Sequence, residues 1–301
     1  MKKIAILTDS NCGISPQEGK EQGIYILPMP VIIQEQIFYE GYEINEQQFY
    51  ERLQNGNSVT TSQPSAGVVM ESWERLLEHY GEVVYIPMSS SLSGSCQTAQ
   101  LLAEEEPFRG RVHVVDNHRI SVTQAQSVYD AKRMAKQGYS GEMIRKTLEK
   151  EAMNATIYIT VDSLTYLKKG GRITTAASLL GTALNLKPIL TIQGGKLDAY
   201  AKCRGMKAAF KKMCQALDAE LEERFYDLYK QGRLKAGIAS TWMEPEKLAM
   251  FRQELKEHYP DMECIYMPLT MSIGAHIGPG GLGIGLVGVH AEKWKEMKIE
   301  E

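Results

Sequence analysis

The first half of the chain alternates short apolar runs with longer amphipathic segments. Three runs rich in β-branched and aromatic residues have the composition of buried strands, and they lie at residues 4–7, 83–86 and 112–115. Helices are predicted from Ser15-Pro16 onward and at residues 46–53, 68–79, 121–137 and 141–152. Strands that alternate with helices predict an α/β fold whose parallel sheet has helices on both faces.

Two prolines disturb this pattern after the first helix. Residues 24–33 have strand composition but contain Pro28 and Pro30, which suit an edge strand or a crossing segment. Residues 38–42 and the polar turns beside them predict a small hairpin, inserted at about residues 30–45.

The pattern changes near Asn154. Strands are predicted at residues 157–161, 187–191, 235–240, 264–268 and 283–289, and helices at 164–169, 176–184, 205–229 and 245–259, with a hairpin at Gly194-Gly195. This order is typical of a mixed sheet with helices on one side. Because single cores usually divide at about 300 residues, we expect an N-terminal α/β/α domain over residues 1–153 and a C-terminal α/β domain over residues 154–301.

A cluster of hydroxyl side chains follows the strand at residues 83–86. Five serines and Gly94 occupy six of the seven positions 89–95, and the serines are Ser89, Ser90, Ser91, Ser93 and Ser95. The N-terminus of a helix offers free backbone N–H groups and the positive end of its dipole, which favour an anion. One or two serines are explained as N-caps. The remaining ones predict a site for a small anion or a carboxylate.

Two more polar clusters follow strands of the predicted parallel sheet. Thr8-Asp9-Ser10 comes after the first strand, and Asp116 comes after the third. Ligands of such sheets bind outside the carboxyl ends of the strands, so these clusters and the serines belong to one edge. The two aspartates could ligate a metal ion, but capping of the strand ends is the simpler interpretation.

Composition removes several classes of function. A net charge of −3 gives no electrostatic basis for binding nucleic acid or an acidic membrane surface. The five cysteines are scattered without a C-x-x-C pair, so neither a disulfide framework nor a zinc site is expected. The apolar run after Met1 is too short for a signal peptide or a spanning helix. We therefore expect a cytoplasmic protein with no metal and no other cofactor.

Motifs of catalysis are mostly absent. No nucleophile elbow surrounds Ser93, and neither a Walker loop nor an H-E-x-x-H motif occurs. Residues 278–283 formally match the dinucleotide pattern G-x-G-x-x-G, but a strand rather than a helix follows them. His276 stands among glycines that leave room for a ligand, although a lone histidine is more often structural.

Six motifs, in order along the chain, resemble those of the DegV family of bacterial fatty-acid-binding proteins. They are TDS at residues 8–10, TSQPS at 61–65, SSSLSGS at 89–95, LKKGGRI at 167–173, KPIL at 187–190 and H-x-GPG at 276–280. The resemblance implies a long-chain fatty acid bound between two α/β domains. It also implies that some members present the acid to a fatty acid kinase, which phosphorylates the carboxylate to an acyl phosphate.

The same resemblance assigns the carboxylate to Thr61, Ser62, Ser93 and His276. Further candidates for the pocket stand in the same motifs, namely Ser91, Gly94, Arg172 and Gly278. Burial of about fourteen methylenes contributes roughly 11 kcal/mol of transfer free energy, while hydroxyls and a helix N-terminus offset the cost of burying the carboxylate. The alternative is an enzyme, a hydrolase or a kinase-like protein, that acts on a small metabolite through the same serines and histidine.

A basic segment is the candidate surface for a partner. Arg204, Lys207 and Lys211 are spaced i, i+3 and i+7, so on a helix they would share one face. No Asp or Glu occurs between Ala199 and Leu217, whereas solvated faces usually mix charges. The resemblance places the kinase-facing surface near Arg204. No basic amphipathic helix or lipidation signal is visible, so membrane contact should be transient.

Overall fold

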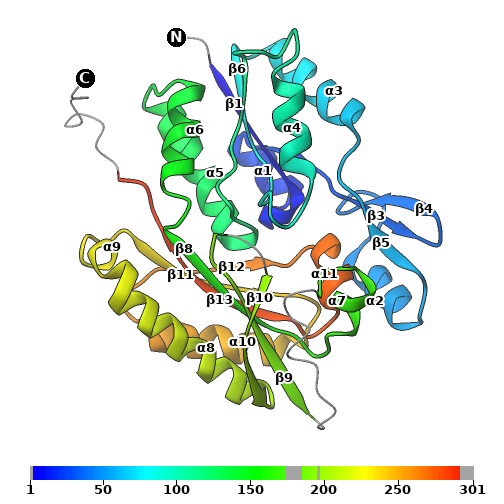
Figure 1. The fold of residues 1–301 in the computed structure, drawn as a ribbon, viewed down its shortest axis with the longest axis vertical. Coiled ribbons are helices and arrows are strands. Elements are labelled where there is room, and N and C mark those ends of the chain that lie inside the picture. The colour runs from blue at the N-terminus through cyan, green and yellow to red at the C-terminus, as the bar shows by residue number, and fades with distance from the viewer. Residues whose placement is uncertain (1–2, 174–184, 195–196, 292–301) are drawn as a thin grey trace.

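The structure, a computed structural model, describes residues 3–173, 185–194 and 197–291. Its first sheet has four parallel strands in the order β2-β1-β6-β7. They are β1 (Ile4–Asp9), β2 (Tyr25–Leu27), β6 (Glu82–Ile86) and β7 (Val112–Val114). This sheet lies in the upper part of Figure 1, and it confirms the parallel sheet predicted from the alternating pattern.

Helices cover both faces of this sheet, as predicted. They are α1 (Pro16–Gln22), α3 (Ala66–Leu77), α4 (Ser95–Ala103), α5 (Ser121–Lys136) and α6 (Gly141–Lys150). On one face, Trp73 of α3 is buried with Val83 and Tyr85 of β6. On the other face, Val128 of α5 is buried with Val84. Because neighbouring residues of a strand point to opposite faces, the uninterrupted apolar run of β6 serves both layers.

The second sheet has six strands in the order β10-β9-β8-β13-β11-β12. They are β8 (Ala155–Thr160), β9 (Leu186–Ile192), β10 (Leu197–Arg204), β11 (Leu234–Ser240), β12 (Cys264–Pro268) and β13 (Leu282–Gly288). The β11–β12 pair is parallel, and the other described pairs are antiparallel. The mixed sheet predicted for the second half is therefore confirmed.

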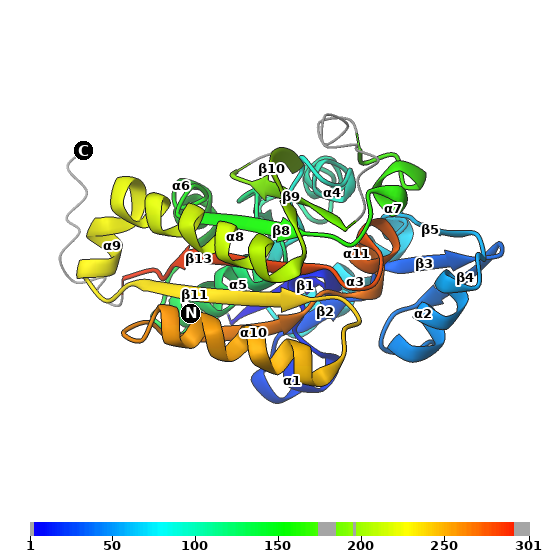
Figure 2. The same cartoon turned by 90° about the horizontal axis from the view of Figure 1, so that it is seen from below.

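The two faces of the mixed sheet are covered by different parts of the chain. Helices α8 (Met206–Glu220) and α10 (Pro245–His258) pack on one face, as Figure 2 shows. The opposite face is covered by α5 of the N-terminal half, which contacts β11, β12 and β13. The close approach depends on Gly237, because a Cβ there would lie 2.7 Å from Val122 Cγ2. The prediction of helices on one side of this sheet therefore holds for the helices of the second half, while α5 of the first half covers the other side.

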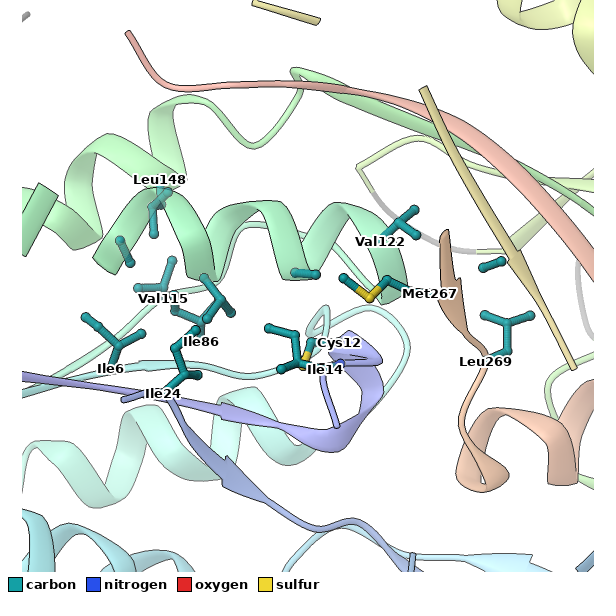
Figure 3. Close-up of a cluster of buried hydrophobic side chains, with 14 of the residues drawn as sticks. Ile6, Cys12, Ile14, Ile24, Ile86, Val115, Val122, Leu148, Met267 and Leu269 are labelled. Carbon is teal, nitrogen blue, oxygen red and sulfur yellow. The ribbon is translucent and has the colours of Figure 1, made fainter. Parts of the chain in front are cut away.

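One buried core joins the two halves. Cys12 and Ile14, which follow β1, belong to the same cluster as Met267 of β12 and Val122 of α5. Figure 3 shows these side chains around the end of α5. A Cβ on Gly13 would lie 3.0 Å from Met267 Cβ, so the loop after β1 packs directly on β12. The exact division at residues 153 and 154 stays a prediction.

A small third sheet stands beside both halves. Its order is β4-β3-β5, all antiparallel, with strands β3 (Pro30–Ile33), β4 (Gln36–Tyr39) and β5 (Val59–Thr61). The insertion is therefore larger than the predicted hairpin, because β5 joins it. Helix α2 (Glu46–Gln54) buries Phe49 and Tyr50 against this sheet, and Ala275 belongs to the same cluster. The third sheet thereby contacts the C-terminal half.

Other elements agree with the sequence pattern in part. The helix predicted at residues 205–229 is α8, a π-helical segment (Leu221–Phe225) and α9 (Tyr226–Lys230) in succession. Helix α7 (Thr165–Lys169) matches its prediction, whereas α11 (Met271–Ile277) has no counterpart among the predicted helices. The helix predicted at residues 176–184, and Gly195 of the predicted hairpin, lie outside the described residues.

Candidate functional site

A cavity of about 580 Å³ is lined by residues from all three sheets and their loops. Its polar lining consists of Asn11, Thr61, Ser62, Gln63, Ser91, Ser93, Ser121, Arg172, Ser272 and His276. Its larger, apolar lining includes Met29, Met88, Leu92, Ile120, Val122, Ile157, Ile159, Leu167, Ile192, Leu197, Leu269, Ile273 and Ile277. The chamber therefore suits an amphiphile with a polar group and a long apolar part.

One polar contact in the lining joins the third sheet to α11. Thr61 Oγ1, at the end of β5, lies 2.7 Å from His276 Nε2. Helix α11 contacts both β5 and α7, and Figures 1 and 2 show these elements side by side. Two residues 215 positions apart are thus held within hydrogen-bond distance.

The imidazole of His276 is kept neutral by its surroundings. Burial, with a smaller effect from the positive charge of Arg172, lowers the pKa of His276 to about 4. Its Nδ1 atom is buried and has no hydrogen-bond partner among the described residues. A Cβ on Gly170 would lie 2.2 Å from that nitrogen, so backbone packs against this edge of the ring. His276 therefore meets a ligand as an uncharged hydrogen-bonding group.

The serine-rich loop is held by local hydrogen bonds and forms part of the cavity wall. The backbone N–H of Ser95, the first residue of α4, donates to Ser93 Oγ at 3.2 Å. The hydroxyl hydrogen of Ser93 remains available to a ligand, since only the oxygen is used as an acceptor there. The N–H of Ser91 donates to Ser89 Oγ. Helix α4 itself begins at Gly94 without a side-chain cap, and the role of the serines toward a ligand stays a prediction.

Gln63 connects the two hydroxyl-bearing loops of the cavity. Its Nε2 atom donates to Thr98 Oγ1 of α4 at 3.0 Å. A Cβ on Gly94 would lie 3.0 Å from Gln63 Oε1, so the glycine allows the loop that carries Ser62 to approach α4. Seven of the eight predicted pocket residues line the cavity, namely Thr61, Ser62, Ser91, Ser93, Gly94, Arg172 and His276. Their roles toward a ligand stay predictions.

Gly278 is the exception, because it does not line the cavity. It ends α11 with a φ of 74°, a left-handed conformation that favours glycine. A Cβ there would lie 2.2 Å from Tyr166 Cδ2, and the carbonyl accepts a hydrogen bond of 2.8 Å from Thr241 Oγ1. Gly278 is thus held by packing, and its proposed place in the pocket stays a prediction. It is a packing residue behind His276.

A buried polar network beside the cavity was not predicted. Asn11 Oδ1 accepts hydrogen bonds from the hydroxyls of Ser272, at 2.7 Å, and Thr270. Glu40, only 5% exposed, accepts from the hydroxyl of Ser10 and from the backbone N–H of Ser272. Burial raises the pKa of Glu40. The neighbouring TDS motif could have indicated that Asn11 belongs to the site. No feature of the sequence indicates that Glu40 is buried beside it.

The two aspartates at the strand ends hold loops. Asp9 accepts hydrogen bonds from the backbone N–H groups of Asn11 and Met88 and from Gln124 Nε2. Burial raises its pKa to about 6. Asp116 accepts from the N–H groups of Ser90 and His118. The interpretation of both as caps of strand ends is confirmed, and the described part of the chain contains no cluster of three potential metal ligands.

The basic segment differs from its prediction in one respect. Arg204 is the last residue of β10, and the helix begins two residues later at Met206. Gly205, with a positive φ of 83°, separates the strand from the helix. Arg204 therefore does not share a helix face with Lys207 and Lys211, although all three side chains are exposed. Within the described ranges, no helix is long and apolar enough to cross a membrane.

The fold and the cavity define a two-domain α/β protein with a chamber between its parallel and mixed sheets. A family model described as "Uncharacterised protein, DegV family" matches residues 3–288. The chain therefore belongs to the DegV family. A DegV domain-containing protein from Deinococcus radiodurans is 33% identical over 284 residues, which cover 94% of this chain and 98% of the relative.

Solved structures of the family have the same fold. A DegV family protein from Thermus thermophilus, described by its fatty acid binding, is 31% identical with a TM-score of 0.85, over 95% of this chain and 100% of that one. DegV of Bacillus subtilis, described as a fatty acid binding protein, is 28% identical with a TM-score of 0.82, over 96% and 100%. A stearic-acid-binding protein from Eubacterium ventriosum is 25% identical with a TM-score of 0.83, over 96% and 98%.

Proposed function

We propose that this protein binds a long-chain fatty acid and holds its carboxylate with Thr61, Ser62, Ser93 and His276. The observation that carries the proposal is the lining of the cavity. The lining holds Thr61 and His276 at 2.7 Å from each other, Gln63 ties the loop that carries Ser62 to α4, and most of the lining is apolar. The relatives described as fatty acid binding proteins support the same ligand class.

Electrostatics favours a monoanionic head group at this place. Arg172 lines the cavity and is exposed, so its charge stands at the opening and attracts an anion. Its Nη1 atom donates to the Gly170 carbonyl, which directs the guanidinium beside His276. Hydrogen bonds to a charged group are worth about 1.5–3 kcal/mol each. Two or three of them offset the cost of removing a carboxylate from water.

The contact between Thr61 and His276 is also relevant to the alternative that the protein is an enzyme. A hydroxyl beside an imidazole could be a nucleophile and its base, but such a base needs a group that orients it and stabilises the imidazolium. The Nδ1 atom of His276 has no such partner among the described residues, and the nearby Arg172 opposes protonation. Binding without chemistry is therefore the function that this arrangement supports best.

We further propose that the protein presents the bound acid to a fatty acid kinase, with Arg204, Lys207 and Lys211 on the docking surface. The support is the exposure of the three side chains and the resemblance to kinase-partner members of the family. Contact with membranes is proposed to be transient, since acyl chains must be taken up from a bilayer.

Native mass spectrometry of the purified protein tests the binding proposal. We expect an adduct with the mass of one long-chain fatty acid, which disappears after organic extraction and returns when the acid is added back. A protein that carries no acid and takes none up from solution would refute the proposal.

A further inference from the structure

Strand β13 has glycine at two of the three positions that face the N-terminal half, with Val287 as the third. Its sequence LGIGLVG places Leu282, Ile284 and Leu286 in the core beneath α8 and α10. Since side chains alternate along a strand, Gly283 and Gly285 face the other way, toward α5 and the cavity. This pattern leaves β13, a central strand of the sheet, without side chains at these two positions of that face.

The two glycines are needed for different reasons. A Cβ on Gly285 would lie 2.4 Å from the backbone oxygen of Thr156, so the packing of the strands excludes any side chain there. On Gly283 the nearest atoms would lie at 3.7 Å, in Ile159 and Tyr158, which is ordinary contact distance. Gly283 also lacks the left-handed φ that favours glycine elsewhere. The protein alone therefore gives no reason for glycine at residue 283.

The cavity supplies the reason. Gly283 lines it together with its two cross-strand neighbours, Ile159 of β8 and Ala239 of β11. The next row of the same face, about 7 Å further along the strands, holds Ile157 and Ile192, which also line the cavity. The row of Gly283 thus separates these isoleucines from α11, which ends just before β13 begins.

We propose that Gly283 determines ligand specificity by leaving open the passage for the hydrocarbon chain. The chain runs from Thr61 and His276 across Gly283 to Ile157 and Ile192. This inference rests on the proposed function and adds that the ligand is a linear acyl chain long enough to pass this row. A side chain at residue 283 would fill the passage and leave the polar residues in place.

The test compares Gly283→Ala and Gly283→Val with the wild type by titration calorimetry, using hexadecanoate and octanoate. Each methylene excluded from the cavity costs about fourfold in affinity. We expect Gly283→Val to bind hexadecanoate at least about tenfold more weakly than the wild type, with Gly283→Ala between them. Octanoate affinity should change less than about twofold. The melting temperature should not fall, because replacing glycine reduces the entropy of the unfolded chain.

Gly67→Ala is the matched control, since Gly67 lies in α3 and a Cβ there would meet no atom within 4 Å. It should leave both affinities unchanged. Equal hexadecanoate affinity in all variants would overturn the inference, and so would a loss of both ligands together with a lower melting temperature. Failure of the wild type itself to bind hexadecanoate would instead refute the proposed function.

Discussion

Glu40 accepts a hydrogen bond of 2.9 Å from the backbone N–H of Ser272, a residue 232 positions later in the chain. The same carboxylate accepts from the hydroxyl of Ser10, in the loop after β1. One buried side chain therefore joins the third sheet, the first sheet and α11. Because the third sheet carries Thr61 and α11 carries His276, this contact helps to set the distance between these two proposed head-group residues.

The Glu40 contact predicts a pH-dependent effect of Glu40→Gln on stability. Burial raises the pKa of Glu40 above its ordinary value of 4.5, so its contribution to stability is complete below that pH and is lost as the pH rises through the folded pKa. The variant stays neutral throughout. Its free energy of unfolding relative to the wild type should therefore improve between pH 4 and pH 8, as measured by urea denaturation.

The exposed Glu35, in the turn of the same sheet, provides the control Glu35→Gln, which should show no such trend. Asp9, whose pKa is raised to about 6, contributes to the raised pKa of Glu40 through its negative charge, so removal of the Glu40 charge acts in the same direction. A difference between Glu40→Gln and wild type that is constant with pH would contradict the prediction.

Substitutions of His276 should distinguish a neutral hydrogen-bonding group from a charged one. Because its pKa is lowered to about 4, His276 is uncharged between pH 6.5 and pH 8.5. We expect His276→Gln to keep most of the affinity for hexadecanoate, since an amide also forms uncharged hydrogen bonds. His276→Ala should cost about 1–3 kcal/mol. Equal losses in both variants would show that the imidazole acts in another way.

The hydrolase alternative is tested on the same proteins with acyl esters of p-nitrophenol. We expect no turnover by the wild type above the rate of spontaneous hydrolysis. Turnover that His276→Ala abolishes would establish His276 as a general base and favour an enzyme.

Loss of the head-group hydroxyls should weaken binding without harming the fold. Thr61→Val and Ser93→Ala should each reduce hexadecanoate affinity by about 1–3 kcal/mol, because a buried carboxylate oxygen loses a donor. Thr60→Val is the matched control, since Thr60 is the exposed neighbour of Thr61 on β5. Unchanged affinity in both site variants, measured by calorimetry, would remove these residues from the site.

Local sequence patterns predicted most of the elements and several residues of the cavity lining. The apolar runs identified β1, β6 and β7, and Ser15-Pro16 marked the start of α1 correctly, with Ser15 Oγ accepting from the N–H of Glu18. Hydroxyls at a strand end identified Ser93 because the carboxyl edge of a parallel sheet is a general ligand position. Thr61 and His276 needed the family resemblance, since no local pattern places them together.

The remaining features depend on contacts between distant segments. Glu40 resembles any surface glutamate in the sequence, and only the fold brings it to Ser10 and Ser272. The helical spacing of Arg204 with Lys207 was misleading because Gly205 ends a strand there. The sequence also did not predict that α5 covers the mixed sheet. Its buried residues include polar ones such as Gln124 and Asp130, so no apolar face marks the contact.

Membrane association should be weak and nearly independent of salt. The net charge is −3, so attraction to anionic lipid is small, and exposed charges are screened at physiological ionic strength. We expect little cosedimentation with vesicles of phosphatidylglycerol and phosphatidylcholine at either 20 or 200 mM salt. Stable binding at low salt that is lost at high salt would indicate a basic surface and contradict the prediction.

The proposed docking surface is tested by Arg204→Ala in a reconstituted reaction with a fatty acid kinase. Arg204 is exposed, ends β10 at the edge of the mixed sheet and does not line the cavity. Its charge should therefore affect encounter with the kinase and not retention of the acid. We expect slower acyl phosphate formation with full fatty acid occupancy by native mass spectrometry, whereas Arg109→Ala, at an exposed arginine before β7, should change neither. Loss of occupancy together with activity would assign Arg204 to the fold or the pocket, and unchanged activity would exclude it from docking.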